Sequence, residues 1–168
     1  MVAGSGERGL VAVGGHTPVG YYKDPEKSAR TFRTVNGVRY SIPGDYAIVE
    51  ADGTMKLLGR GSQCINTGGE KVYPEEVEEV LKRHPAVEDA ATVGLPDPQW
   101  GQAIHSLVVL REGEAATEAA LRDHVREHLA AYKIPKRIFA VESLGRSPSG
   151  KMDYKGVTRR VTELSVPN

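Results

Sequence analysis

Apolar residues in the stretch 1–59 occur in short runs separated by glycine, a pattern typical of short strands rather than long helices. The Asp52-Gly53 pair favours a hairpin turn between two of these runs. Asp24 is placed to cap a short helix, because Pro25 suits the first helical position. The expected strands lie within 10–13, 40–49 and 55–58. We therefore predict a small β-rich unit at the start of the chain.

From residue 60 onward the pattern changes to alternating helices and strands, so a domain boundary is expected there. The stretch 74–84 shows the helical signals: Pro74 opens it, acidic residues fill its first turn, and basic residues at its other end complement the helix dipole. The expected helices are 74–84, 118–132 and 154–164, and the expected strands are 89–95, 103–110 and 137–142. This order predicts an α+β fold, in which the small β-rich subdomain precedes a compact domain with a central short sheet and about three helices.

Composition excludes several classes of protein. The chain has 22 Lys plus Arg against 22 Asp plus Glu, so it lacks the basic excess of a nucleic-acid binder, and no nucleic-acid partner is expected. Its one cysteine, Cys64, cannot form an internal disulfide, which favours a reducing compartment and a cytoplasmic location. No apolar stretch approaches the roughly 20 residues of a membrane-spanning helix, so we expect no transmembrane segment. The region from Lys133 onward has a basic excess, which suits a small phosphate-bearing ligand.

Two short motifs match known spacings but lack residues that their chemistry needs. Residues 145–151 have the spacing of a P-loop, yet Met152 stands where a Ser or Thr would hold magnesium. His124, Glu127 and His128 have the spacing of an inverted zinc-protease motif, but no third protein ligand is evident. An amphipathic helix with its apolar side inward accounts for the histidines better. We therefore expect neither a P-loop nor a bound metal in this chain.

Four segments that are rich in glycine, proline and charged residues follow one another in order. They span residues 20–45, 59–78, 94–101 and 132–151, and include Tyr-Ser-Ile-Pro-Gly-Asp45, Gly68-Gly69-Glu-Lys-Val-Tyr-Pro and Pro-Ser-Gly-Lys151. In this order the chain resembles the carboxyl-terminal portion of acyl-CoA synthetases of the adenylate-forming superfamily. The resemblance covers essentially the whole chain. It implies that 1–59 is the β-rich end of an amino-terminal adenylation domain, 60–63 a hinge and 64–168 a mobile α+β domain.

The resemblance implies a reaction in two steps: a carboxylate attacks the α-phosphate of ATP to give an acyl-adenylate, and the thiol of CoA then displaces AMP. Lys151 would reach the carboxylate and the α-phosphate in the first step, where a positioned cation stabilises the developing charge. Asp45 would accept hydrogen bonds from the ribose hydroxyls, and Arg60 would contact the same nucleotide. The expected cofactors are ATP and magnesium, with the magnesium held mainly by the amino-terminal domain, and CoA is the expected co-substrate.

The same resemblance implies a set of CoA-binding residues. Gly68 and Gly69 would lie in a loop along the pantetheine tunnel, where a missing side chain lets the backbone approach a narrow ligand. Trp100 and Tyr132 would stack on the adenine of CoA, and Lys136 would lie near its phosphates. Trp100 as an ordinary core residue is the alternative.

Three positions depart from the family pattern. Ile134 stands where such ligases can carry arginine, so the contact to a CoA phosphate differs here. Ser62 occupies the hinge position, where Asp or Lys is usual, although hinges need only absorb a backbone rotation. Pro43 replaces the more usual threonine and so removes a hydroxyl from the nucleotide side.

The favoured function is an acid-thiol ligase that activates a fatty or other lipophilic carboxylate. The chain shows no phosphate loop of the superfamily and no segment for an acid pocket, so the amino-terminal domain of the same enzyme is the expected partner, together with ATP, CoA and the acid. By itself the chain is predicted to be inactive, and the exposed strands of 1–59 could associate between copies. Two alternatives stay open: an adenylating enzyme that loads a carrier protein, and a binding module without chemistry. The sequence indicates neither the acid and its chain length nor the oligomeric state.

Overall fold

The computed structural model describes residues 2–166, except for the side chain of Ser62. The described chain divides into two compact units, one that ends at Ser62 and one that begins at Gln63. Both units mix helices with small sheets, which confirms the predicted α+β class. Within the described part of the chain, no helix combines the length and the apolar character that crossing a bilayer requires.

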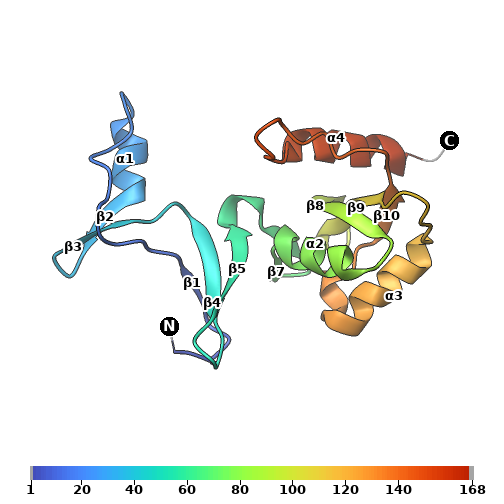
Figure 1. The fold of residues 1–168 in the computed structure, drawn as a ribbon, viewed down its shortest axis with the longest axis horizontal. Coiled ribbons are helices and arrows are strands. Elements are labelled where there is room, and N and C mark those ends of the chain that lie inside the picture. Colours follow the sequence, from blue (N-terminus) through green and yellow to red (C-terminus); the bar gives the residue numbers. More distant parts are fainter. Residues whose placement is uncertain (1, 167–168) are drawn as a thin grey trace. The chain divides into compact units, whose positions relative to one another are not determined.

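The first unit contains a three-stranded antiparallel sheet, a two-stranded hairpin and one short helix (Figure 1). The sheet has the strand order β1-β4-β5, and the hairpin joins β2 to β3. The helix is capped as its sequence predicts, because the Asp24 side chain accepts a hydrogen bond from the backbone N–H of Lys27 at 2.9 Å. The elements are β1 (Arg8–Leu10), α1 (Pro25–Thr31), β2 (Phe32–Val35), β3 (Val38–Ser41), β4 (Asp45–Val49) and β5 (Met55–Arg60).

Two strand predictions in this unit were wrong in their bounds. The strand expected at 10–13 ends at Leu10, and of the later residues Val13 forms only an isolated bridge with Ser41. The stretch expected as one strand at 40–49 is divided between β3 and β4, because Gly44 has a φ of +98° and turns the chain between them. The aromatic and β-branched residues of this stretch favour one continuous strand, and the turn at Gly44 divides it.

The second unit is built around a long antiparallel hairpin of β8 and β9. Strand β10 adds to β9 in parallel, and the small β6–β7 hairpin adds to the other end of β9. The elements are η1 (Gly61–Gln63, at the junction of the two units), β6 (Ile65–Thr67), β7 (Glu70–Val72), α2 (Pro74–Arg83), β8 (Val87–Asp97), β9 (Gly101–Leu110), α3 (Glu118–His128), η2 (Ala131–Lys133), β10 (Arg137–Ala140) and α4 (Tyr154–Ser165).

Both faces of the β8–β9 hairpin are buried. Helices α2 and α3 pack on one face and α4 on the other (Figure 1). Neighbouring residues of β8 alternate between the two cores, so that Ala90 belongs to the α2–α3 side and Ala91 to the α4 side. On β9, Leu107 and Val108 divide in the same way, and all four residues are fully buried. The hairpin is therefore the central layer of a three-layer unit.

The helices lie close to their predicted positions. Helix α2 begins at Pro74, as expected, and ends one residue earlier than predicted. Helix α3 ends at His128, four residues before the predicted end. There Leu129 adopts extended backbone angles, and its partly buried side chain packs against the α2–α3 core. Packing of this one leucine ends a helix that the amphipathic pattern alone would continue.

Leu121 of α3 provides a test of the α2–α3 core, since its side chain is 2% exposed and belongs to the same cluster as residues of α2 and the sheet. We expect Leu121→Ala to lower the free energy of unfolding by about 2–5 kcal/mol, because it leaves a cavity in a close-packed core. Urea unfolding followed by circular dichroism measures this change. Leu164→Ala is the matched control, because Leu164 is 47% exposed, and it should cost about 0.5 kcal/mol or less. Equal losses in the two variants would contradict this description of the core.

Candidate functional site

Lys151 lies at the end of a tight turn between β10 and α4. The hydroxyl of Ser147 accepts a hydrogen bond from the backbone N–H of Lys151 at 3.1 Å, and the Ser147 N–H donates to the carbonyl of Lys151 at 2.9 Å. Gly150 has a φ of +76°, which this turn requires. The Lys151 side chain is exposed and forms no hydrogen bond or ion pair with any described residue. A fixed backbone thus presents a cation whose charge is not compensated.

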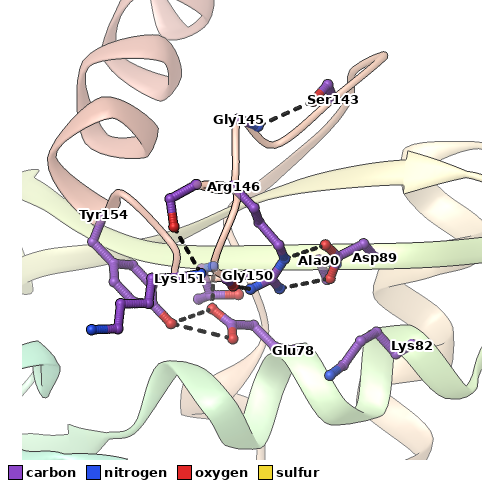
Figure 2. Close-up of polar contacts among 12 residues, drawn as sticks. Glu78, Lys82, Asp89, Ala90, Ser143, Gly145, Arg146, Gly150, Lys151 and Tyr154 are labelled. Atoms are coloured by element: carbon purple, nitrogen blue, oxygen red, sulfur yellow. Dashed lines mark hydrogen bonds and ion pairs between the residues drawn. The ribbon is translucent and has the colours of Figure 1, made fainter.

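Arg146 attaches this turn to strand β8 (Figure 2). Its Nε and Nη2 donate to the two carboxylate oxygens of Asp89 at 2.6 and 2.8 Å, and its Nη1 donates to the carbonyl of Gly150 at 3.1 Å. The hydrogen bonds from Arg146 hold the pKa of Asp89 below its usual range. Arg146 therefore positions the residue immediately before Lys151. Sequence reasoning assigned no role to this pair, because nothing in a single sequence connects residues 57 positions apart.

Glu78 on α2 contacts the start of α4, the helix that follows the Lys151 turn (Figure 2). Its carboxylate accepts a hydrogen bond from the backbone N–H of Thr92 at 2.7 Å and lies 3.4 Å from the hydroxyl of Tyr154, the first residue of α4. The residue is 7% exposed, and burial raises the pKa of its carboxyl to about 7. Burial, and then the charge of Glu78, raise the pKa of the Tyr154 phenol. Glu78 was also not singled out from the sequence, where it reads as one acid of a charged helix.

A second site lies at the opposite end of the β8–β9 hairpin. It is a pocket of about 590 Å³, formed by the β6–β7 turn, the β8–β9 turn, α3 and the η2 segment. Four of the five predicted CoA-binding residues line it: Gly68, Trp100, Tyr132 and Lys136. Trp100 is 50% exposed and Tyr132 is 43% exposed, so the alternative of Trp100 as a core residue is wrong. The complete lining is Thr67, Gly68, Glu70, Gln99, Trp100, Ala103, Ile104, Arg122, Ala131, Tyr132, Ile134 and Lys136.

Gly68 lets the two turns of this pocket touch. Gly68 and Gly69 have φ values of +58° and +86° and form a two-residue hairpin turn, a conformation that strongly favours glycine. The Gly68 N–H donates to the carbonyl of Trp100 at 2.9 Å. A Cβ on Gly68 would lie 2.9 Å from an indole carbon of Trp100, so any larger residue would displace the tryptophan. The glycine pair was predicted from the sequence, but its contact with Trp100 was not.

Asp97 holds two of the predicted residues together. One carboxylate oxygen accepts a hydrogen bond from the backbone N–H of Trp100 at 3.0 Å, and the other accepts one from Nζ of Lys136 at 2.9 Å. The hydrogen bond from Lys136 is the main reason that the pKa of Asp97 is lowered. Asp97 is thus a positioning residue for both sides of the pocket. Asp97 lies three residues before Trp100 in the sequence, a spacing at which an aspartate can accept a hydrogen bond from the backbone of a turn.

The two predicted nucleotide-binding residues meet in the first unit. Asp45 and Arg60 face each other in the register of β4 and β5, and Arg60 Nε donates to Asp45 Oδ1 at 3.3 Å. Ser62, the predicted hinge residue, lies in η1, and its side chain is outside what the structure describes.

The histidines of α3 are held by backbone carbonyls. His124 Nε2 lies 3.0 Å from the carbonyl of Val80, and His128 Nδ1 lies 2.8 Å from the carbonyl of His124. Together with Glu127 they bring one ligand atom each within 4.8 Å of one another. Hydrogen bonding on the helix surface accounts for both imidazoles, and the absence of a metal here stays a prediction.

The buried carboxyl of Glu78 gives the second unit a measurable pH dependence. The pKa of this carboxyl is raised from 4.5 to about 7 in the folded protein. The folded state therefore loses stability relative to the unfolded state as pH rises from about 4.5 to above 7, because the buried carboxyl must ionise. Relative to Glu78→Gln, the free energy of unfolding of the unaltered chain should fall by as much as about 3 kcal/mol over this range. Urea unfolding at pH 5 and pH 8 measures the change. The exposed residue Glu163 supplies the control Glu163→Gln, and the same pH slope in both variants would contradict the assignment.

Comparisons with known proteins give a family match within the second unit. Residues 76–151 match the model of the AMP-binding enzyme C-terminal domain. The chain is 58% identical over 152 residues to a medium/long-chain-fatty-acid–CoA/3-oxocholest-4-en-26-oate–CoA ligase of Mycolicibacterium smegmatis, covering 90% of this chain and 28% of the relative. It is 41% identical over 143 residues to a sulfoacetate–CoA ligase of Cupriavidus necator, covering 85% of this chain and 28% of that protein. The chain thus spans a little over a quarter of the length of these curated relatives.

Solved structures give the same result for the fold. The amide bond synthetase McbA from Marinactinospora thermotolerans is 35% identical with a TM-score of 0.83, over 92% of this chain and 31% of that one. ATP-bound MatB from Rhodopseudomonas palustris is 29% identical with a TM-score of 0.79, over 96% and 32% respectively. Residues 76–151 therefore belong to the AMP-binding enzyme C-terminal domain family, and most of the chain is similar to part of the CoA ligases named above.

Proposed function

We propose that this chain is the carboxyl-terminal part of an ATP-dependent ligase that converts a carboxylate into an acyl-adenylate and then transfers the acyl group to CoA. The observation that carries the proposal is Lys151, an exposed and uncompensated cation on a turn that Arg146 fastens to the sheet. The names of the relatives, which are CoA ligases for fatty, steroid and sulfonated acids, support the reaction class.

In the first step Lys151 neutralises charge as the substrate carboxylate approaches the α-phosphate. A preorganised cation is effective there because it needs no reorganisation during the reaction. The hydrogen-bonded turn around Gly150 fixes the backbone of Lys151. The long side chain of Lys151 then carries its ammonium group to the reacting atoms. Asp45 and Arg60 bind the nucleotide: the second carboxylate oxygen of Asp45 is available to the ribose hydroxyls while the first is engaged by Arg60.

In the second step the pocket of the β8–β9 turn receives CoA. Trp100 and Tyr132 offer exposed aromatic faces on which an adenine can stack. Lys136, held by Asp97, stands at the same pocket as a phosphate partner. The turn at Gly68 and Gly69 brings backbone without side chains to the edge where the narrow pantetheine arm would pass.

Magnesium does not fit Glu78 or Asp89, the two acids whose hydrogen bonds hold the surroundings of the Lys151 turn. Glu78 is engaged by Thr92 and Tyr154, and Asp89 by both donors of Arg146. Neither carboxylate is left to form a magnesium site beside the turn, so we assign any magnesium bound with ATP to the rest of the enzyme.

The partner of this chain is an amino-terminal adenylation domain, with residues 60–63 as the hinge between the two parts. The first unit exposes several large apolar side chains, which support its packing against further protein: Val13, Val19, Met55 and Leu57. Self-association of the isolated chain through the same residues is the corresponding expectation. The cytoplasmic location also belongs to this proposal and is supported by the cysteine content, because a sequence with one cysteine offers no pair for an internal disulfide.

A fatty or steroidal acid is the substrate class that we propose, on the strength of the 56–58% identity to ligases with those names. None of the roles proposed above involves the acyl chain, so this part of the proposal rests on the relatives. Transfer to a carrier protein, or a role without chemistry, would be favoured only if free CoA failed to react.

Lys151→Ala in the complete enzyme tests the proposal. We expect acyl-adenylate formation, measured by ATP–pyrophosphate exchange, to fall about 10²- to 10³-fold, because one preorganised charged donor is lost. Thioester formation from preformed acyl-adenylate and CoA should change little. Lys155→Ala, which removes an exposed lysine from α4, is the control. If neither step responds to Lys151→Ala, the turn is structural and the ligase assignment of this site is wrong.

The isolated 168-residue chain should show no ATP–pyrophosphate exchange with any carboxylate. It holds Lys151 but lacks a phosphate-binding loop of the kind that the superfamily carries. Exchange above the buffer control, measured with the purified chain, would contradict the proposal that the amino-terminal domain is needed for acyl-adenylate formation.

A further inference from the structure

Arg122 is half-buried, and one of its donor atoms has no hydrogen-bond partner among the described residues. It lies on α3 and lines the pocket beside Trp100 and Tyr132. Its Nε is buried and has no hydrogen-bond partner among the described residues. A buried N–H that is left unpaired costs free energy, and most such groups in folded proteins find a partner. The guanidinium therefore lies at the pocket with capacity to donate hydrogen bonds that the described residues do not use.

The charges around the pocket favour an anion as the partner of Arg122. Lys136, the other cation in the lining, is already paired with Asp97 at 2.9 Å. Among the described residues no carboxylate pairs with Arg122, and the one acid of the lining, Glu70, is exposed. Arg122 is thus the cation of the lining whose charge is not compensated. A guanidinium presents a planar set of donors that matches a phosphate in two-point contact.

The position of Arg122 also explains the departure at Ile134. Ile134 lines the same pocket, but its side chain packs against the α2–α3 core and cannot contact a phosphate. A cation from α3 therefore enters the pocket where the connecting segment after η2 supplies none. Aromatic faces and an uncompensated guanidinium in one cavity suit a phosphorylated nucleoside.

We infer that Arg122 binds the 3′-phosphate of CoA, and that it thereby selects free CoA over a carrier-bound phosphopantetheine arm, which has no adenosine. This inference rests on the proposed function. The 3′-phosphate is attached directly to the ribose of the adenosine, so an adenine between Trp100 and Tyr132 brings it into the same cavity as Arg122. As a terminal monophosphate it carries more charge than either phosphate of the CoA diphosphate bridge, which makes it the preferred partner for an unpaired guanidinium.

The test compares CoA with 3′-dephospho-CoA in the thioester step of the complete enzyme. The unaltered enzyme should prefer CoA, and Arg122→Gln should lower kcat/KM for CoA about tenfold to hundredfold, chiefly through KM, while leaving 3′-dephospho-CoA nearly as reactive as before. Arg122→Lys should retain part of the preference. Arg126→Gln is the matched control, since Arg126 lies on the same helix, pairs with Asp123 and is outside the pocket lining.

The outcomes separate the two proposals. Equal effects of Arg122→Gln on both thiols, or no effect on either, would overturn the assignment of Arg122 alone. An unaltered enzyme that forms acyl-adenylate but no thioester with CoA would overturn the CoA part of the proposed function and this inference with it. Activity with 3′-dephospho-CoA also shows that the variant is folded, so a loss confined to CoA is specific.

Discussion

The burial of the β8–β9 hairpin on both faces is the constraint on which the second unit depends. A strand with two buried faces must send alternate residues into two different cores, and small residues such as Ala90 and Ala91 let helices approach from both sides. The two cores are joined through the hairpin and through the neighbouring strand β10, whose Ile138 belongs to one core while Phe139 packs against the other. Any change that loosens the hairpin would therefore affect α2 and α3 on one side and α4 on the other.

The buried polar groups of this hairpin serve the same layer. Thr92 and Ser106, which are opposite each other in the register, lie with their hydroxyls 2.8 Å apart, and both are fully buried. The backbone N–H of Thr92 is satisfied by Glu78 of α2, whose carboxylate also faces the Tyr154 hydroxyl of α4. A single acid thus links the helices of both layers across the edge of the sheet. Its burial raises its pKa, because the charged form loses the solvation that water would give.

The sequence predicted the elements of this unit well and its connections poorly. The helix at 74–84 is predicted by its opening proline and by the acidic and basic residues at its two ends. Strands β8 and β9 are predicted by their apolar runs. The end of α3 could not be predicted, because it depends on where Leu129 packs. For the candidate sites, motif residues such as Gly68, Trp100 and Lys151 were identified. Their supports, Arg146 and Asp97, were not, since each is defined by a contact with another segment, and Arg122 was not, since only the folded chain places it in the pocket lining.

Strand β8 holds the two candidate sites apart, and this separation bears on the mechanism. Asp89 near its start fixes Arg146 and the Lys151 turn, whereas Asp97 at its end fixes Trp100 and Lys136. Eight residues of extended chain separate these acids, which corresponds to about 26 Å at roughly 3.3 Å per residue. A rigid unit of this size cannot place Lys151 and the nucleotide pocket at one reacting carbonyl in the same orientation. If both sites serve one acyl group, either the pantetheine arm spans this distance or the unit reorients between the two steps. Reorientation of this kind would require the hinge proposed at 60–63. The backbone rotation of that hinge would occur at Gly61 and its neighbours.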